Sequence, residues 1–356
     1  MKFRINLMEG VIMTKVDIYS GFLGAGKTTL IKKMIAEGYK GQKLVLIENE
    51  FGEIGIDGGF LQDAGINITE MNSGCICCSL VGDFGKALEK VIGEYHPDRI
   101  IIEPSGVGKL SDVIGAVNKV IGPDVTLGYT VAVVDAGKVK VYTKNFGEFY
   151  NNQVETASTI ILSRTDSVPQ AKLDTAVEML RERNQAATII TTPWAQLTGQ
   201  QLVEAMEGKA SLAAELARLE TQRLEEEEAQ EHHHHHHDED EHEHHHHDED
   251  CGCHDHEHHH HHHHHADEVF TSWGVETSKK FDKATVEAAL KALDTEKYGM
   301  ILRAKGILPA VDGTWIHFDY VPEEANIRTG SADITGKLCV IGSKLDEAAI
   351  AQLFGV

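Results

Sequence analysis

Continuous apolar runs recur along the first 200 residues of the chain, with segments of helical spacing between them. Buried strands that alternate with helices are typical of a parallel α/β sheet with both faces covered. We assign this α/β domain, with a mostly parallel sheet, to residues 1–208. The predicted strands are "VDIYS" (16–20), "KLVLIENE" (43–50), "RIIIEPSG" (99–106), "YTVAVVDA" (129–136), "STIILSRTD" (158–166) and "AATIITTPW" (186–194).

Two of the intervening helices have predicted ends. The segment "LIKKMIAEG" (30–38) has helical spacing and Gly38 as its expected C-cap. The segment "FGKALEKVIGEYHPD" (84–98) is an amphipathic pattern that Pro97 should end.

The last part of the chain, residues 269–356, predicts a small α+β domain. Its helix at 282–293 has Asp282 as the expected N-cap. The other predicted elements are a strand at 269–281, a hairpin at 298–322, a strand at 338–345 and a closing helix at 346–355.

Between these two regions lies a segment that cannot build a core, which we treat as a linker over residues 209–268. It begins with a helical, increasingly polar stretch and continues into "EHHHHHHDEDEHEHHHHDEDCGCHDHEHHHHHHHHADE". This tract holds 21 of the 23 histidines. Its composition predicts disorder in the absence of metal.

The charge of the chain is concentrated in the same place. Residues 225–268 contain 17 Asp and Glu and no Lys or Arg, so they account for most of the net charge of −23. An acidic balance argues against nucleic-acid binding and favours attraction of cations. No apolar run approaches 18 residues, and the start lacks the long apolar core of a secretory signal, so we expect a cytoplasmic protein without a membrane span.

The segment "GFLGAGKTT" (21–29) follows the first predicted strand and opens a helix, which is where the pattern GxxxxGK[ST] binds phosphate. Gly21 and Gly26 let backbone N–H groups turn toward phosphate oxygens. Lys27 should reach the β- and γ-phosphates, and Thr28 should ligate Mg²⁺.

Two later strand ends carry further candidates. Glu103 ends an apolar run near the sheet edge where ligands of α/β proteins bind, and can hold Mg²⁺ directly or through water. Gly106 can offer a backbone N–H to the γ-phosphate. Asp166 ends another run and can accept hydrogen bonds from N1–H and N2–H₂ of guanine, a pattern that adenine does not offer.

Three cysteines, Cys75, Cys77 and Cys78, lie in "GCICC" between the phosphate loop and Glu103. Thiolates suit Zn²⁺ and Co²⁺, and three of them leave a fourth position for an exchangeable ligand. Glu48, Glu50, Glu53 or a residue of a client protein are candidates for that position. A redox switch and a set of buried small side chains are the alternatives; Cys339, inside "KLCVIG", is expected in the core.

The histidine tract adds many weak ligands for Zn, Ni, Cu or Co, and we expect it to act as a reservoir that feeds the cysteine site. The alternative interpretations of the tract are a solvated spacer between the domains and a purification tag. Below about pH 6 the imidazoles protonate and metal should leave. The selected ligands are His232, His236, His244, Cys251, Cys253, His254, His256 and His260.

Together, "GFLGAGKTT", "ENEFGEIGID", "GCICC", "IIIEPSG", "SRTD", "LRAKGIL" and "TWIHFDYVP" resemble the CobW/nitrile-hydratase-activator family of metal-handling P-loop GTPases. The resemblance implies GTP hydrolysis coupled to delivery of a transition metal, often zinc or cobalt, to a client protein. It implies that Glu103 is the acid of the ExxG motif and that the cysteine triplet is the metal site. The phosphate and Mg²⁺ residues that it implies are Gly24, Ala25, Gly26, Lys27, Thr28 and Thr29.

The chain departs from the family at the base-reading motif, where NKxD is usual and Ser163-Arg164-Thr165-Asp166 stands. Asp166 keeps the guanine contact, and Arg164 keeps a long aliphatic stem that can cover the base. Ser163 replaces the usual Asn, which leaves the stringency for guanine open.

The sequence thus predicts a GTPase that uses GTP and Mg²⁺, binds Zn²⁺ (or Co²⁺ or Ni²⁺) and delivers it to an apo-metalloprotein client. Nucleotide-dependent self-association is a further possible partner interaction. The alternatives are a cobalt-handling GTPase for corrinoid synthesis, a metal store with a nucleotide switch, and a small-molecule P-loop kinase, which would not explain the cysteines or the tract.

Overall fold

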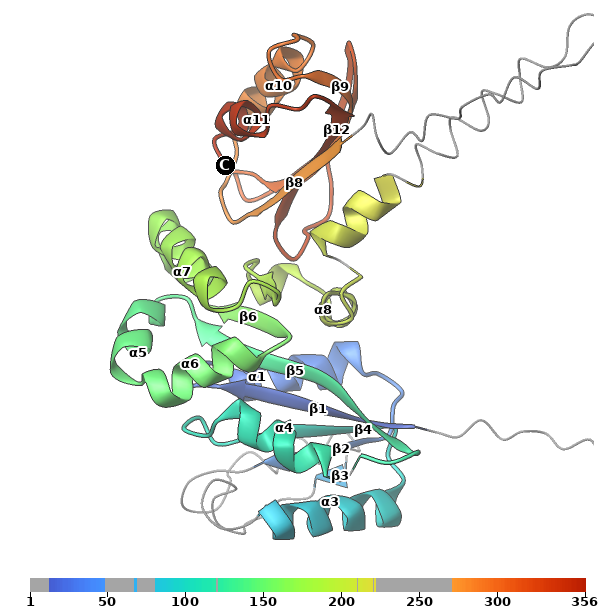
Figure 1. Cartoon of the computed structure of the whole chain (residues 1–356). Helices are drawn as coiled ribbons and strands as arrows, with labels where there is room; N and C mark the ends of the chain where they lie inside the picture. The colour runs from blue at the N-terminus through green and yellow to red at the C-terminus, as the bar shows by residue number, and fades with distance from the viewer. Residues whose placement is uncertain are drawn as a thin grey trace, which may run out of the picture.

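The computed structural model describes residues 13–48, 67–68, 81–119, 121–209, 211–219, 221 and 271–356. They form a parallel sheet covered by helices, followed by a separate antiparallel sheet (Figure 1). The predicted fold class of a P-loop α/β domain with a small C-terminal α+β domain is confirmed. We call the residues up to 209 around the parallel sheet the first domain and residues 271–356 the second domain. The predicted limits at residues 208 and 268 stay predictions.

The first domain is built on seven parallel strands in the order β3-β2-β4-β1-β5-β6-β7. The central strand β1 pairs with β4 on one side and β5 on the other. All six strands expected from apolar runs are present. The strands are β1 (Thr14–Gly21), β2 (Leu44–Glu48), β3 (Asn67–Ile68), β4 (Arg99–Glu103), β5 (Val125–Asp135), β6 (Thr159–Ser163) and β7 (Thr188–Ile190).

Helices cover both faces of this sheet because successive strand residues point to opposite sides. On one face, alternate residues such as Ile100 and Ile102 pack against α3 (Val81–Tyr95), α4 (Leu110–Asn118), α6 (Gly147–Thr156) and α7 (Gln170–Arg183). On the other, Ile101 and its neighbours pack against α1 (Lys27–Lys33), the π-helix η1 (Met34–Gly38) and α8 (Gly199–Met206). The remaining helical segments are α5 (Val139–Asn145), η2 (Thr165–Ser167) and η3 (Trp194–Gln196).

The second domain is a five-stranded sheet in the order β11-β10-β9-β12-β8, with antiparallel neighbours throughout. The Asp282 side chain accepts a hydrogen bond from the Ala284 N–H at 2.9 Å, so the predicted N-cap is confirmed. The elements are β8 (Thr271–Thr277), α10 (Lys283–Ala292), β9 (Met300–Pro309), β10 (Trp315–Val321), β11 (Glu324–Thr329), β12 (Gly336–Ser343) and α11 (Glu347–Phe354).

Helical residues 212–219, which the sequence assigns to the linker, pack on this second sheet. Leu219 is buried against Cys339 and Ile341, which confirms Cys339 as a core residue. Glu215 also forms an ion pair of 2.8 Å with Lys305 of β9.

The prediction that Gly38 caps a helix is wrong. Gly38 is the last residue of the π-helix η1, and its φ is not in the left-handed region that favours glycine at a C-cap. Its role is close packing instead: a Cβ atom on Gly199, at the start of α8, would lie 2.4 Å from the Gly38 nitrogen.

The connection between β11 and β12 packs against the first domain. Ile334 from this connection is 1% exposed and belongs to the hydrophobic core of the first domain. Its carbonyl accepts hydrogen bonds from the N–H groups of Thr191 and Thr192, at 3.0 and 3.2 Å, just beyond β7. The second domain thus bonds to the chain just beyond the edge strand β7 and helps to fill the core of the first domain.

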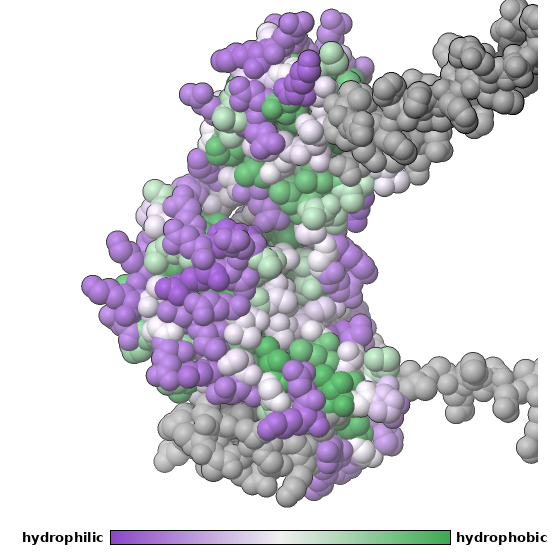
Figure 2. Space-filling model, viewed as in Figure 1, coloured by the Kyte–Doolittle hydropathy of each residue, from purple (hydrophilic) through white to green (hydrophobic). Residues whose placement is uncertain are grey.

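In Figure 2, hydrophilic side chains cover much of the described surface, with smaller hydrophobic areas on both domains. Within the described ranges, no helix has the length and apolar character needed to cross a membrane.

Candidate nucleotide site

The phosphate loop connects the central strand β1 to α1 at the carboxyl end of the parallel sheet. Gly26 precedes the helix with φ of 102°, and Gly24 has φ of 69°, so both occupy the left-handed region that glycine tolerates best. A Cβ atom on Gly21 would lie 2.4 Å from the Val133 carbonyl oxygen of β5. These three glycines let the loop turn tightly, as the motif predicts. Ala25 is buried, and Thr29 is exposed on the first turn of the helix.

Thr28 and Glu103, predicted as Mg²⁺ ligands, lie in contact. The Thr28 hydroxyl donates to the two carboxylate oxygens of Glu103, at 3.1 and 3.3 Å. Glu48 is the register partner of Glu103 on the neighbouring strand, so two acidic residues end adjacent strands here. Hydroxyl and carboxylate oxygens are the ligands that Mg²⁺ prefers, and the residues present therefore fit this ion.

Lys27 lies beside the same carboxylate. Its ammonium is 3.9 Å from Glu103 Oε1, and its side chain is only 10% exposed. A distance near 4 Å is a loose ion pair. An anion that enters the loop would compete with Glu103 for this lysine.

Gly106 packs directly on the phosphate loop, because a Cβ atom there would lie 2.8 Å from the Leu23 nitrogen. The side-chain amide of Gln153, in α6, donates to the carbonyls of Gly106 and Gly108 at 3.0 and 2.8 Å. Gln153 thus fixes the loop after β4. This role of Gln153 was not predicted, because no local pattern in a helical segment indicates which residue will bind a distant loop.

The base-reading motif also meets the phosphate loop. Arg164 has φ of 57°, and its guanidinium donates to the Gly24 carbonyl at 3.0 Å and pairs with Asp135 at the end of β5. Ser163 is buried, and its hydroxyl donates to the Val134 carbonyl at 3.4 Å. Asp166 is exposed and accepts a hydrogen bond of 3.1 Å from the Ser167 hydroxyl.

Two further residues at this edge were not predicted. Asp135 ends an apolar run, the same signal that marked Glu103, and could have been found by it. Trp194 lies under the loop: its ring would be 3.2 Å from a Cβ atom on Gly26, and its Nε1–H donates to the Leu162 carbonyl at 3.0 Å. Only the folded chain brings Trp194 to this place.

Aromatic rings pack behind the phosphate loop. The Phe22 ring lies 4.7 Å from that of Tyr142 and 4.9 Å from that of Phe146, measured between ring centroids. Tyr150 completes the group, and burial raises the pKa of its hydroxyl well above the ordinary value, so it stays neutral.

Of the predicted transition-metal ligands, Glu48 lies in the part of the chain that the structure describes, and the others fall outside it. Among the described residues, no group of three or more His, Cys, Asp or Glu side chains is arranged to hold a metal ion. The predicted ligands outside the described ranges are Glu50, Glu53, Cys75, Cys77, Cys78, His232, His236, His244, Cys251, Cys253, His254, His256 and His260.

The sequence matches two families, one over each sheet. Residues 15–191 match the family described as "CobW/HypB/UreG, nucleotide-binding domain", and residues 270–355 match the "Cobalamin synthesis protein cobW C-terminal domain". The chain belongs to the CobW family. The phosphate loop, Glu103 and the Arg164 loop all fall inside the first match.

Curated relatives of this CobW-family chain match it over about half of their own length. "Zinc chaperone YeiR" of Escherichia coli is 32% identical, covering 43% of this chain and 47% of the relative. "Zinc chaperone CobW" of Sinorhizobium sp is 34% identical, with coverages of 44% and 52%. "Zinc-regulated GTPase metalloprotein activator 1" of Schizosaccharomyces pombe is 29% identical, with coverages of 51% and 46%.

Proposed function

We propose that this protein is a GTPase that binds a transition metal, with zinc as the first choice, and delivers it to an apo-metalloprotein client. The contact between Thr28 and Glu103 at the head of the phosphate loop carries the proposal, because it brings together the hydroxyl and the acid that this chemistry requires. The names of the zinc chaperones among its relatives support the choice of cargo.

In this proposal the phosphate loop holds GTP through its backbone N–H groups. Lys27 moves from Glu103 to the phosphate oxygens, and the Gly106 N–H faces the γ-phosphate. Thr28 and Glu103 would hold Mg²⁺, which when bound neutralises charge on the β- and γ-phosphates. The oxygen of a water molecule then bonds to the γ-phosphorus. The bond from this phosphorus to the bridging oxygen breaks, which gives GDP and phosphate.

The guanine contact is assigned to Asp166. The bond from Arg164 to the Gly24 carbonyl supports this role, because it ties the motif that contains Asp166 to the phosphate loop. The Ser163 hydroxyl holds the end of β6 by its bond to the Val134 carbonyl of β5. Serine stands here in place of the usual Asn of the motif. GTP is therefore proposed over ATP.

The cargo is assigned to Cys75, Cys77 and Cys78, with the histidine tract as the reservoir that supplies them. Glu48 would couple nucleotide binding to metal binding. It ends the strand beside Glu103, and the sequence runs on from it to the cysteines. Three further points remain predictions from the sequence: delivery to a client protein, the location of this protein in the cytoplasm, and its nucleotide-dependent self-association.

The test is GTP hydrolysis by the full, metal-stripped chain, titrated in parallel with Zn²⁺, Co²⁺ and Ni²⁺. We expect one metal to change turnover or GTP affinity in the wild type and to have no effect in the Cys75/Cys77/Cys78→Ser triple variant. Cys339→Ala is the matched control, because it removes a thiol from the core of the second domain.

Equal responses of the wild type and the triple variant to every metal would contradict coupling through these thiols. A chain that hydrolyses no GTP with or without metal would contradict the GTPase itself.

A further inference from the structure

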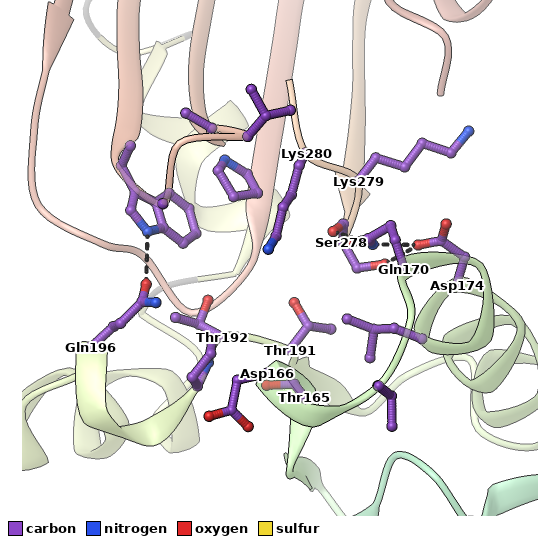
Figure 3. Close-up of a pocket in the computed structure, with 18 of the residues that line it drawn as sticks. Thr165, Asp166, Gln170, Asp174, Thr191, Thr192, Gln196, Ser278, Lys279 and Lys280 are labelled. Carbon is purple, nitrogen blue, oxygen red and sulfur yellow. Dashed lines mark hydrogen bonds between the residues drawn. The ribbon is translucent and has the colours of Figure 1, made fainter. Parts of the chain in front are cut away.

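A cavity of about 700 Å³ lies between the two domains, beside the base-reading motif (Figure 3). Thr165, Asp166, Thr191 and Thr192 line it from the first domain, and Lys280 and Trp315 are among its lining residues from the second. This volume falls within the usual range for sites that bind small molecules or short peptide segments.

One ammonium group at the cavity, that of Lys280, has no partner among the described residues, and Lys280 is exposed to solvent. Figure 3 shows the Lys280 side chain directed toward Thr191 and Thr192. In the described part of the chain, no hydrogen bond or ion pair reaches the Lys280 ammonium. The neighbouring Lys279 also lines the cavity, but its side chain is directed away from that of Lys280 (Figure 3), and its ammonium donates to the Gly355 carbonyl at 2.7 Å.

The cavity is also lined by two carboxylates, those of Asp166 and Asp174, and neither forms an ion pair with Lys280. Asp174 accepts hydrogen bonds from Gln170, at 2.8 Å, and from the Ser278 hydroxyl, at 2.7 Å. Asp166 accepts from Ser167, and its carboxylate points to the side opposite Lys280 (Figure 3).

A second polar group in the wall also lacks a partner. Thr165 is 7% exposed, and its hydroxyl has no hydrogen-bond partner among the described residues. Buried hydroxyls are normally paired, so one without a partner in a cavity wall points to a missing ligand or water. The other threonines are committed, since Thr191 bonds Thr335 at 3.0 Å and Thr192 donates to the Asp333 carbonyl at 2.6 Å.

The rest of the lining is largely apolar. Pro193, Pro309, Ala310 and the ring of Trp315 contribute carbon surface. The Trp315 Nε1–H donates to the Gln196 side-chain oxygen at 3.3 Å, which fixes the orientation of the ring. The lining therefore combines the Lys280 ammonium and the carboxylates of Asp166 and Asp174 with an aromatic and aliphatic wall.

We propose that this cavity binds a ligand that carries a carboxylate on a short apolar body. The carboxylate pairs with Lys280, and the apolar body packs against Trp315 and Pro309. Such a group can come from a free organic acid or from the C-terminal residue of a peptide, and the two share this chemistry.

Binding in the cavity should be linked to binding of the nucleotide, a part of the proposal that rests on the proposed function of Asp166. The second domain holds both loops that line the cavity. Gln170 lies four residues after Asp166, at the start of α7, and its side chain donates to the Ser278 carbonyl at 2.6 Å. Thr191 and Thr192 are bound to Ile334. A ligand that spans these walls favours one arrangement of the base-reading loop, and by reciprocity the nucleotide alters its affinity.

The experiment uses the full chain without nucleotide, with N-acetylphenylalanine as the probe and its uncharged carboxamide as the matched control ligand. Binding is followed by tryptophan fluorescence and by NMR. We expect the acid to bind up to about fivefold more tightly than the amide, because Lys280 is exposed and an exposed ion pair contributes at most about 1 kcal/mol. Lys280→Met should remove that preference, whereas Lys279→Met, with the same change of charge, should keep it within about twofold.

Equal binding of the acid and the amide, no saturable binding of either, or equal effects of the two lysine variants would overturn the proposal. A longer peptide with the same free C-terminal phenylalanine identifies the source: tighter binding of the peptide indicates a peptide ligand, and tighter binding of the single acid indicates a small molecule.

The link is measured as the GDP affinity at saturating acid. A change of at least twofold, absent in Lys280→Met, is expected, and an unchanged affinity would overturn the link alone. Failure to bind GDP at all would count against the proposed function and would leave the acid-binding result standing.

Discussion

Arg164 connects two parts of the nucleotide site with one side chain, through its bonds to the Gly24 carbonyl and to Asp135. We expect Arg164→Met, which keeps the aliphatic stem, to lower GTP affinity about tenfold, because a hydrogen bond from a charged donor is worth about 1.5–3 kcal/mol and a factor of ten is about 1.4 kcal/mol. Arg164→Ala, which also removes the stem, should lower it further. Nucleotide titration of the two variants measures both effects.

Arg183→Met is the control for this pair, because Arg183 makes its ion pair with Glu155 on helices away from the phosphate loop. If the affinity of Arg164→Met stays within twofold of the wild type, the guanidinium does not hold the two loops together.

Gly26 carries two constraints that can be separated. Gly26→Ala should destabilise the fold by about 1–2 kcal/mol through its left-handed backbone, and further through contact of the new Cβ with the Trp194 ring at 3.2 Å. Gly41→Ala is the matched control, since Gly41 has φ of 85° and nothing within 4 Å of such a Cβ. Chemical denaturation should show the larger loss for Gly26→Ala, and equal losses would show that Trp194 gives way.

Asp294 offers a pH test in the second domain. The Glu323 N–H and then the Tyr320 hydroxyl hold the pKa of this carboxyl below its ordinary value of 3.8. A group with a lowered pKa in the folded state adds stability above its unfolded pKa and loses that stability as the pH falls through the folded value. In Tyr320→Phe we expect the pKa of Asp294 to rise toward the ordinary value, as measured by carboxyl NMR titration.

Asp312 serves as the internal control in that titration. Its pKa is lowered by hydrogen bonds from Thr314, on a different turn, and should not change in Tyr320→Phe. An unchanged pKa of Asp294 would mean that the Glu323 N–H alone holds it down.

At the scale of elements, the sequence predicts what burial makes visible. The six predicted strands of the first sheet are continuous apolar runs because helices cover both faces, and Glu103 could be selected because an acid ends one of them. The strand β11 was not predicted, since "EANIRT" is a mostly exposed edge strand with only two apolar residues, Ala325 and Ile327. The two residues of β3 are too short to leave any pattern.

The misassigned Gly38 shows a second limit. A glycine near the end of a helical pattern indicates a C-cap by local rules, whereas here it allows another helix to approach. Contacts of this kind join segments far apart in the sequence. The same holds for Trp194 and Gln153, whose roles depend on neighbours that no local spacing reveals.

The junction of η1 and α8 supplies a prediction for these elements. Gly199→Ala places a Cβ 2.4 Å from the Gly38 nitrogen and 2.5 Å from Glu37 Cβ, so we expect a loss of about 1–3 kcal/mol from overpacking. Gly115→Ala, inside α4 with nothing within 4 Å, should instead stabilise the chain by about 0.5–1 kcal/mol, because alanine favours a helix over glycine. Denaturant titration of both variants decides, and two changes of the same sign would contradict the packing argument.

At the scale of the whole molecule, Ile334 makes the two domains depend on each other. Ile334→Ala removes a side chain from the core of the first domain, with an expected loss of about 2–5 kcal/mol. It should also speed hydrogen exchange at the N–H groups of Thr191 and Thr192, which bond to its carbonyl.

Ile350→Ala is the matched control, because Ile350 is equally buried but packs only within the second domain. It should destabilise that domain and leave exchange at Thr191 and Thr192 close to the wild type. Equal acceleration in both variants would indicate that the domains open together rather than through the Ile334 contact.

The place of Ile334 in the chain has a consequence for synthesis. The first sheet ends at Ile190, but the side chain that completes its core is added only at residue 334, after the whole histidine tract. At roughly 5–20 residues per second, the ribosome needs on the order of ten seconds to cover that interval. The histidine-rich segment therefore leaves the ribosome while the first domain still lacks part of its interior.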